Sequence, residues 1–228
     1  MHKLITFEGV DGCGKSTQLN RAADYLRDMG HDVVTTFEPG DTPLGVEIRK
    51  LLLAGNFVPV PEAELLLFLA DRAQHVRQVI GPALASGAWV LCDRYSDSTL
   101  AYQLAARKLG DGAVNLKEML SFAECGVRPA LTLWFDVSVS EAMRRMKKRA
   151  EAGEKATRLD EEAVSFHERV SAAFGQQFSS QQFSSQQFSS QQCNGEPDRI
   201  QRINAEQGMD DVQQQVRAVL NQRFGLAA

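Results

Sequence analysis

The segment FEGVDGCGKSTQ, at residues 7–18, constrains the fold of this chain more than any other feature. Residues 9–16 match the pattern G-x-x-x-x-G-K-[ST] in full, between a short apolar run (Leu4–Phe7) and a stretch with helical spacing (Lys15–Met29). Glycines let backbone N–H groups turn inward around a phosphate, and the N-terminus of the following helix favours an anion. The pattern therefore predicts a buried strand, a phosphate-binding loop and a helix, in that order.

The residue types of the loop predict how it holds a nucleoside triphosphate. Lys15 reaches the terminal phosphates as a point charge, and Ser16 offers a hydroxyl to Mg²⁺. We interpret Cys13 as a small filler rather than a nucleophile. The predicted nucleotide-binding residues are Gly9, Val10, Asp11, Gly12, Cys13, Gly14, Lys15, Ser16 and Thr17. GTPases, motor ATPases and small-molecule kinases share such loops, but this chain has no N-K-x-D motif for reading guanine.

The rest of the chain alternates short apolar runs with helical spacing. The predicted strands are Leu4–Phe7, Asp32–Thr36, Ala88–Cys92, Leu131–Phe135 and the weaker Arg199–Asn204. The predicted helices are Lys15–Met29, Pro43–Leu53, Pro61–Gly87 with a break or kink at Gly81-Pro82, Ser98–Leu109, Leu116–Glu124, Ser140–Ala150, Glu162–Phe174 and Met209–Phe224. This alternation implies crossover connections. We therefore expect one α/β domain over residues 1–228, with a five-stranded parallel sheet flanked by helices on both faces.

Composition and charge argue against several other classes of protein. The 228 residues carry a net charge of −4, without the basic excess of a duplex-binding protein, so we expect no nucleic-acid partner. There is no run of 18 apolar residues, and the N-terminus turns to acid and glycine too soon for a signal peptide, so we expect no membrane association. The four cysteines form no C-x-x-C and no zinc spacing, which favours reduced thiols in the cytoplasm.

Residues 176–190 are a low-complexity segment in which QQFSS occurs three times, followed by the decayed copy QQCNG. In a helix, a five-residue period turns successive phenylalanines by about 140°, so Phe178, Phe183 and Phe188 form no stripe. Burial of each ring gains about 1.5–3 kcal/mol, whereas ordering each backbone residue costs about 1–2 kcal/mol. We therefore expect an exposed, mobile insertion at about 176–192. The alternative is an extension of the preceding helix, because glutamine is a fair helix former.

Four further clusters indicate a second substrate site. They are F-E-P-G-D-T-P-L-G at 37–45, closed by Glu47-Ile48-Arg49; L-F-L-A-D-R at 67–72; D-R-Y-S-D-S-T at 93–99, running to Ala101-Tyr102-Gln103; and a basic run at 144–149 that ends in T-R-L-D at 157–160. Asp93 and Arg94 directly follow the third predicted strand, and ligands bind at the carboxyl ends of strands in open α/β sheets. There an acid can hold Mg²⁺ and an arginine can clamp a phosphate.

Together with the phosphate-binding loop, these signatures make nearly the whole chain, apart from the QQFSS segment, resemble bacterial thymidylate kinases. The resemblance implies a three-layer P-loop kinase fold and transfer of the γ-phosphoryl group of ATP to dTMP, with Mg²⁺. It also implies that residues 144–160 form a lid. The alternatives are another P-loop nucleotide kinase with a different base preference, or a nucleotide-binding switch without transfer chemistry.

The resemblance implies a role for each site residue. The implied catalytic residues are Lys15, Asp93, Arg94 and Arg158, with Arg158 closing on the transferred phosphoryl group and with Ser16 and Asp93 holding Mg²⁺. The implied dTMP contacts are Asp11 near the sugar 3′-hydroxyl, Arg49 and Arg94 on the monophosphate with Glu38 beside it, Phe68 stacked on thymine, Arg72 at the edge of the base, Thr99 and Gln103 around it, and Tyr102 against a 2′-hydroxyl. From the residues alone, Arg49 and Arg72 could equally be helix-surface arginines, Phe68 a core residue, and Arg158 a surface partner of Asp160 or Glu161.

The chain departs from the bacterial pattern at three places. Phe37 stands where arginine is usual, Asp41 replaces the second glycine of E-P-G-G-T, and the QQFSS segment separates a helix from the fifth strand. Gly12 occupies a slot where one subtype carries arginine, so the resemblance places that charge in the lid. The stretch Ala63–Leu69 is apolar on more than one helical face, and the resemblance implies a homodimer that uses this helix.

Overall fold

The computed structural model describes residues 3–54, 58–109, 116–153, 155–187 and 198–226, with the backbone alone for 116–117 and 180–187. The strands are β1 (Leu4–Glu8), β2 (Val33–Phe37), β3 (Trp89–Asp93), β4 (Leu131–Asp136) and β5 (Ile200–Asn204). The helices are α1 (Lys15–Asp28), α2 (Pro43–Leu53), α3 (Pro61–His75), α4 (Gly81–Ala85), α5 (Ser96–Thr99), α6 (Leu116–Ala123), α7 (Val139–Glu151), α8 (Val164–Gln187) and α9 (Met209–Phe224), with two π-helical segments, η1 (Val76–Ile80) and η2 (Leu100–Ala106).

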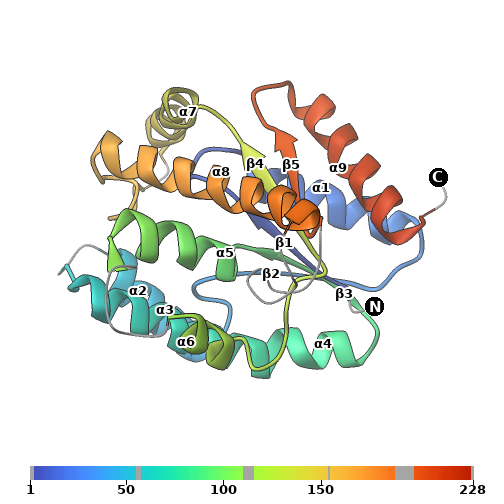
Figure 1. Ribbon diagram of the computed structural model, residues 1–228, viewed down its shortest axis with the longest axis horizontal. Coiled ribbons are helices and arrows are strands. Elements are labelled where there is room, and N and C mark those ends of the chain that lie inside the picture. The colour runs from blue at the N-terminus through green and yellow to red at the C-terminus, as the bar shows by residue number, and fades with distance from the viewer. Residues whose placement is uncertain (1–2, 55–57, 110–115, 154, 188–197, 227–228) are drawn as a thin grey trace.

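The strands form one parallel sheet in the order β2-β3-β1-β4-β5 (Figure 1). The central strand β1 pairs with β3 through Phe7↔Asp93 and with β4 through Glu8↔Trp134. On the far side of β3, Phe37 of β2 is also paired with Asp93. The carboxyl ends of β1, β2 and β3 therefore meet at one edge of the sheet, which confirms the expected α/β architecture.

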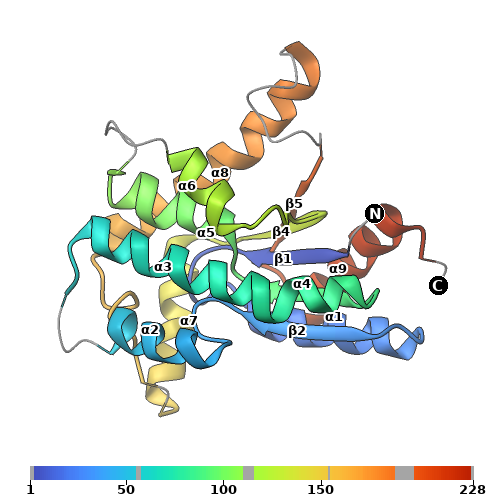
Figure 2. The same cartoon turned by 90° about the horizontal axis from the view of Figure 1, so that it is seen from below.

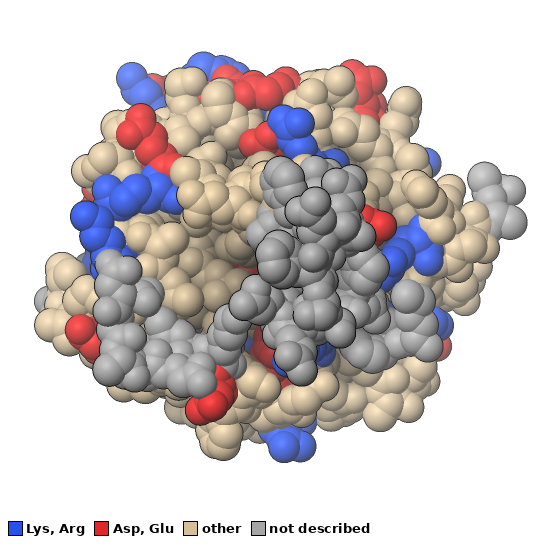
Figure 3. All heavy atoms as spheres, in the orientation of Figure 1, with Lys and Arg blue, Asp and Glu red and all other residues tan. Residues whose placement is uncertain are grey.

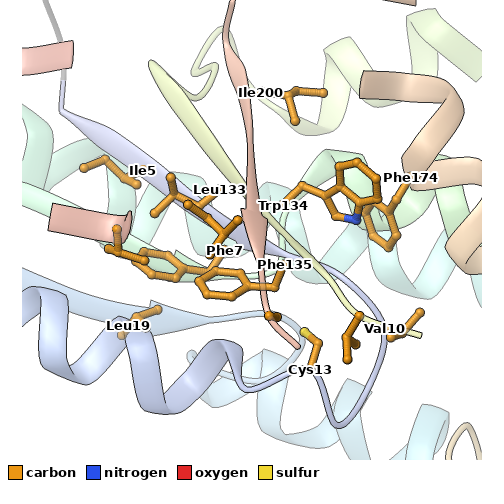
Figure 4. Packing of buried hydrophobic residues seen from close by; sticks show 14 of the residues in the cluster. Ile5, Phe7, Val10, Cys13, Leu19, Leu133, Trp134, Phe135, Phe174 and Ile200 are labelled. Carbon is orange, nitrogen blue, oxygen red and sulfur yellow. The ribbon is translucent and has the colours of Figure 1, made fainter. Parts of the chain in front are cut away.

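Successive strand residues face opposite helical layers, so both faces of the sheet are apolar. In β3, Leu91 belongs to the larger core cluster with Leu26 of α1, whereas Val90 packs with Ile80 on the opposite face. Helices α1 and α9 lie together on one face, and α4 contacts β3 on the other (Figure 2). On that second face, Val76 and Ile80 of η1 belong to the same buried cluster as Val90 of β3. In the larger cluster, the rings of Phe7 and Phe135 stack with centroids 5.7 Å apart (Figure 4).

The long helix expected over Pro61–Gly87 changes its winding before the proline rather than at it. α3 ends at His75, η1 continues to Ile80, and α4 begins at Gly81. Pro82 has no N–H to donate, and its ring would clash with the carbonyl four residues earlier in a regular α-helix. A Cβ at Gly81 would lie 2.9 Å from the carbonyl oxygen of Val76. The π-helical turn lies directly ahead of Pro82, and the absence of a Cβ at Gly81 permits the backbone N–H of Gly81 to bond the carbonyl oxygen of Val76 in that turn.

The described part of the QQFSS segment extends the preceding helix, which was the alternative prediction. α8 does not end near Phe174 but continues to Gln187, and residues 188–192 lie outside the described range. The expectation of an exposed insertion is wrong for Phe178. Its partly buried ring packs against the main core, 5.5 Å between centroids from Trp134 of β4. The sequence argument compared the free energy gained by burying three rings with the entropy cost of ordering an isolated segment. A helix that already begins at Val164 can be extended at little further cost per residue.

Three other expectations concern surface and redox state. Across the described residues, no helix is both long and apolar enough to cross a membrane. On the face drawn in Figure 3, acidic and basic side chains are interspersed. Cys13, Cys92 and Cys125 are free thiols, and Cys193 lies outside the described residues.

Candidate active site

A cavity of about 970 Å³ opens at the carboxyl edge of the sheet. Its walls come from the phosphate-binding loop, the loop after β2, α3, the loop after β3 with η2, and the segment from α7 to the lid. The predicted site residues that line it are Asp11, Gly12, Gly14, Lys15, Ser16, Thr17, Glu38, Arg49, Phe68, Arg72, Asp93, Arg94, Thr99, Tyr102 and Gln103. Residues far apart in the sequence are therefore brought together around one space.

The loop between β1 and α1 has the backbone geometry that its glycines predict. Gly9, Gly12 and Gly14 all have positive φ, at 144°, 82° and 97°. Gly12 has no room for a side chain, because a Cβ would lie 2.3 Å from the carbonyl oxygen of Ala142 in α7. This contact explains why the slot for a loop arginine is closed here.

Lys15 lies at the start of α1 and bends back over the loop. Its Nζ donates to the carbonyl oxygens of Gly9 at 3.2 Å and Val10 at 3.0 Å. Cys13 is buried beside it, and burial raises the pKa of this thiol. A thiol held neutral is a poor nucleophile, which agrees with its interpretation as a filler.

Ser16 and Asp93 meet at the end of β3. The Ser16 hydroxyl donates to Oδ2 of Asp93 at 2.5 Å. A hydroxyl and a carboxylate side by side, next to a phosphate-binding loop, are the oxygen donors that Mg²⁺ prefers. The chemistry of these two side chains therefore fits a magnesium ion.

Asp11, Arg94 and Tyr102 form a charged cluster between the loop and η2. Nη2 of Arg94 lies 2.6 Å from Oδ1 of Asp11, and the Tyr102 hydroxyl donates to the other carboxylate oxygen at 3.0 Å. Burial alone would raise the pKa of Asp11, but the charges of Arg94 and Lys15 hold it well below its usual range. Arg94 has a φ of 73°, a conformation that costs a non-glycine residue about 1–3 kcal/mol. Its contacts fix this strained residue with its guanidinium toward the cavity.

Glu38 organises the other side of the cavity. It follows β2, and its carboxylate pairs with Arg72 at 2.8 Å and with Nδ1 of His75 at 3.0 Å; all three side chains are buried. Arg72 in turn donates to the Thr99 hydroxyl at 3.0 Å, which links α3 to α5. Sequence reasoning missed His75, although it lies three residues after Arg72, on the same face of α3.

Glu8 is a second residue that the sequence did not single out. It is fully buried at the end of β1, accepts the backbone N–H of Tyr95 at 2.7 Å and contacts the Ser98 hydroxyl at 2.5 Å. Burial and the nearby charge of Asp97 raise its pKa to about 8. Ser98 also accepts from Arg94 at 3.0 Å, so Glu8 supports the loop that carries Arg94.

The departures in the loop after β2 are accommodated locally. Phe37 is partly exposed, and the guanidinium of Arg49 lies over its ring, 5.6 Å from the centroid. Nη1 of Arg49 also donates to the carbonyl oxygen of Pro39 at 2.7 Å. The Thr36 hydroxyl donates to the carboxylate of Asp41. Phe37 and Asp41 therefore shape the wall of the cavity without displacing Arg49 from it.

Phe68 and Gln103 form the part of the cavity expected to hold the base. Phe68 lines the cavity and also packs against the main core, so its core contacts do not remove it from the cavity, and its stacking on a base stays a prediction. Gln103 is buried on η2, and its Nε2 donates to Oε1 of Glu64 at 3.0 Å. An aromatic face opposite a fixed amide can stack on a planar base and bond its edge.

Arg158 is the one predicted catalytic residue that does not line the cavity, and the loop residues Gly9, Val10 and Cys13 do not line it either. Its guanidinium donates to the carbonyl oxygen of Leu52 at 3.0 Å and to Oε2 of Glu64 at 2.5 Å. Asp160 and Glu161, its expected surface partners, are not the carboxylates that it contacts. Within residues 144–160, which were predicted to form a lid, the arginines that line the cavity are Arg145 and Arg149.

The parallel sheet has a phosphate-binding loop after β1, and Ser16, Asp93, Arg49 and Arg94 line one cavity beside it. This arrangement is that of the class of P-loop nucleotide kinases. The comparison with family models then identifies a family within this class. The model "Thymidylate kinase" matches residues 7–216, and the chain belongs to this family.

Individual relatives match along most of their length. The thymidylate kinase of Geobacter sulfurreducens is 41% identical over 226 residues, covering 98% of both chains. That of Teredinibacter turnerae is 41% identical over 219 residues, covering 96% of this chain and 97% of the relative. That of Carboxydothermus hydrogenoformans is 47% identical over 174 residues, covering 76% and 83%.

Proposed function

We propose that the protein transfers the γ-phosphoryl group of ATP to dTMP, giving dTDP and ADP. The observation that supports this function most is that Lys15 and the phosphate-binding loop line the same cavity as Arg49 and Arg94, which gives it positive charge for two anions. Phosphoryl transfer needs little covalent chemistry from the protein. It needs two anions aligned and the charge on the transferred group neutralised.

On the ATP side, the loop residues Gly9 to Thr17 would cradle the phosphates through backbone N–H groups. Lys15 would release the two carbonyl oxygens it now bonds and contact the terminal phosphates. Ser16 and Asp93 would hold Mg²⁺, which, when bound, neutralises charge on the phosphate oxygens.

On the dTMP side, Arg49 and Arg94 would hold the monophosphate, and Asp11 would face the sugar 3′-hydroxyl. The depressed pKa keeps Asp11 an acceptor at every physiological pH. Phe68 would stack on the base, with Thr99 and Gln103 around it. We assign no general base, because a nucleotide monophosphate is already a competent nucleophile near neutral pH, its second pKa being about 6.

The lid, taken as residues 144–160, would exclude water that could otherwise accept the phosphoryl group. Arg145 and Arg149 already line the cavity, and Arg145 would exchange its contacts with Glu141 and the carbonyl oxygen of Ala205 for the phosphates. The role implied for Arg158, direct contact with the transferred group, stays a prediction. It requires Arg158 to leave Glu64 and Leu52 on closure.

A coupled ADP-release assay tests the proposal. The purified chain is supplied with ATP and Mg²⁺ and, in parallel, with dTMP, dUMP, UMP or dGMP. We expect turnover to be fastest with dTMP. Faster turnover with another nucleotide would favour a kinase of different base preference, and ATP binding without turnover on any of them would favour a nucleotide-binding switch.

We also propose a homodimer formed through α3 and α6, and a cytoplasmic location. These helices contact each other, and their outward side chains include Leu66, 56% exposed, and Phe122, 83% exposed. Exposed apolar side chains that lie together in one patch are typical of interaction surfaces. Light scattering at micromolar concentration should give twice the chain mass of 25.2 kDa. A monomer there would contradict this proposal.

A further inference from the structure

A charged cluster lies beside the base end of the cavity, where α3, η2 and the lid meet. It contains Glu64 in the first turn of α3, Arg107 after η2, Arg158 in the lid loop and Glu162 before α8. Oε2 of Glu64 lies 2.5 Å from Arg158 and 3.1 Å from Arg107. Glu162 pairs with Arg107 at 2.5 Å. Two carboxylates and two guanidiniums therefore balance their charge in one place.

Glu64 is the centre of this cluster. Its side chain is 1% exposed, against 8% for Arg158 and 16% for Arg107. Burial opposes ionisation of Glu64, but hydrogen bonds from Arg107, Gln103 and Arg158 lower its pKa below the usual value. A buried carboxylate kept charged by three donors holds the groups around it in fixed positions.

The first group that it holds faces the base. A carboxylate can only accept hydrogen bonds, so the group that Gln103 turns to Glu64 must be the nitrogen of its amide. The carbonyl oxygen of Gln103 is then the end available to the cavity that this residue lines. Glu64 thus determines that the base meets an acceptor at this position.

The second group that it holds is the lid loop. Besides Glu64, Arg158 contacts Leu52 through its side chain, and its own backbone N–H donates to the carbonyl oxygen of Leu53 at 3.3 Å. The neighbouring lid residues Thr157 and Leu159 line the cavity, whereas Arg158 points the other way, into the cluster. Arg158 therefore fastens the lid loop to the ends of α2 and α3.

We propose that Glu64 is a positioning residue whose buried carboxylate orients Gln103 toward the base and anchors the lid loop through Arg158. The inference rests on the proposed transfer to dTMP and gives Arg158 an anchoring role in place of contact with the transferred group. An anchor affects substrate capture and exclusion of water, whereas a transition-state contact affects the rate of transfer.

The test compares Glu64→Gln with Glu62→Gln, a matched control in the same helical turn whose side chain is exposed. Glutamine keeps the shape of Glu64 but replaces one acceptor oxygen with an amide nitrogen, so position 64 no longer requires the nitrogen of Gln103, and it loses the charge that holds both arginines. We expect Glu64→Gln to raise the KM for dTMP about tenfold, to lower kcat less than fivefold, and to increase ADP release in the absence of dTMP. Glu62→Gln should match the wild type in all three quantities.

Arg158→Gln removes the lid side of the same link. We expect it to reproduce the rise in KM, and the double variant to be no worse than the more affected single variant, because both changes break one interaction. Additive effects would overturn the proposal. So would a fall in kcat of about a thousandfold in Arg158→Gln with an unchanged KM for dTMP, which would make Arg158 a catalytic residue.

Folding and function are separated by two controls. Circular dichroism melts show whether each variant is folded at the assay temperature. If Glu64→Gln is unfolded, Arg158→Gln alone decides the question: a raised KM for dTMP supports anchoring, and a strongly lowered kcat refutes it. Failure of the wild type to phosphorylate dTMP would refute the proposed function. Normal wild-type turnover with an unaltered Glu64→Gln enzyme would refute the inference about Glu64 only.

Discussion

Truncation of Phe178 tests whether the first QQFSS unit is part of the folded core. The Phe178 ring is partly buried and packs against Trp134 at 5.5 Å between centroids. This contact extends the core cluster beyond Phe174, where the sequence predicted the helix to end. Such an aromatic pair contributes about 0.5–1.5 kcal/mol beyond its buried area, and a fully buried Phe→Ala change costs about 3–5 kcal/mol. For a half-buried ring, we expect Phe178→Ala to lower the free energy of unfolding by about 2 kcal/mol.

The expected shift in melting temperature follows from the chain length. In proteins of this size, 1 kcal/mol corresponds to about 2–4 °C, so Phe178→Ala should lower Tm by about 4–8 °C. Gln176→Ala, an exposed position on the same helix, is the control and should change Tm by less than about 2 °C. Differential scanning calorimetry gives Tm, and the ADP-release assay should show unchanged kcat, because Phe178 does not line the cavity.

Deletion of Gln181–Ser190 completes this test. The deletion removes two whole repeats, keeps Phe178 and joins its repeat to Gln191-Gln192. The deletion shortens the end of α8 and the connection after it. Extending a helix is nearly neutral in free energy per residue, and a doubling of loop length costs only about 0.6 kcal/mol, so the shortened chain should melt close to the wild type. If the deletion destabilises the protein more than Phe178→Ala does, the contact with Trp134 is not what attaches this segment, and the reasoning fails.

Three further changes probe the site. Lys15→Ala should preserve the fold and lower kcat by orders of magnitude, because the lost contact is to the transferring phosphates; near-normal kcat would contradict the assignment of the loop. Phe68→Ala should weaken use of dTMP by about 1–3 kcal/mol and leave the KM for ATP nearly unchanged, measured by initial rates; unfolding of the variant would mean that its core contacts dominate. Glu8→Gln should reduce the pH dependence of stability between about pH 4.5 and 8. The folded pKa of Glu8 is raised from 4.5 to about 8, so the folded state keeps a proton that the unfolded chain releases, and this contribution to stability is lost as pH rises through that window. Urea melts at pH 5 and pH 8 measure the difference, and an equal slope in variant and wild type would show that Glu8 does not titrate there.

Much of the fold could be predicted because it depends on local patterns. The predicted bounds are within one or two residues of the observed ones for β1, β4 and α9. Buried strands appear in a sequence as apolar runs, and helices as apolar residues at helical spacing. The continuation of α8 could not be predicted in the same way. It depends on whether Phe178 finds Trp134, a contact across the fold that no periodicity of the repeat contains.

The candidate site divides along the same line. The order of residues in the phosphate-binding loop predicts its geometry, because glycine positions determine where the backbone can turn. The partner of Arg158 could not be predicted: sequence reasoning weighed nearby Asp160 and Glu161, whereas the structure supplies Glu64, 94 residues away along the chain. Glu8 and His75 were overlooked because a single acid in a strand and a single histidine in a helix have no motif of their own.

The close approach of Gly12 to Ala142 has a mechanical consequence. α7 begins at Val139 and carries the basic residues of the lid toward its far end at Glu151. With Ala142 lying against the phosphate-binding loop, the helix can act as a lever with its fulcrum at that contact. Nine residues separate Ala142 from Glu151, or about 13 Å at 1.5 Å per residue, so a tilt of about 10° would carry the far end by about 2 Å. Such a tilt would couple the position of the phosphates in the loop to the position of the arginines of α7. A side chain at position 12 would collide with Ala142 and separate the helix from the loop.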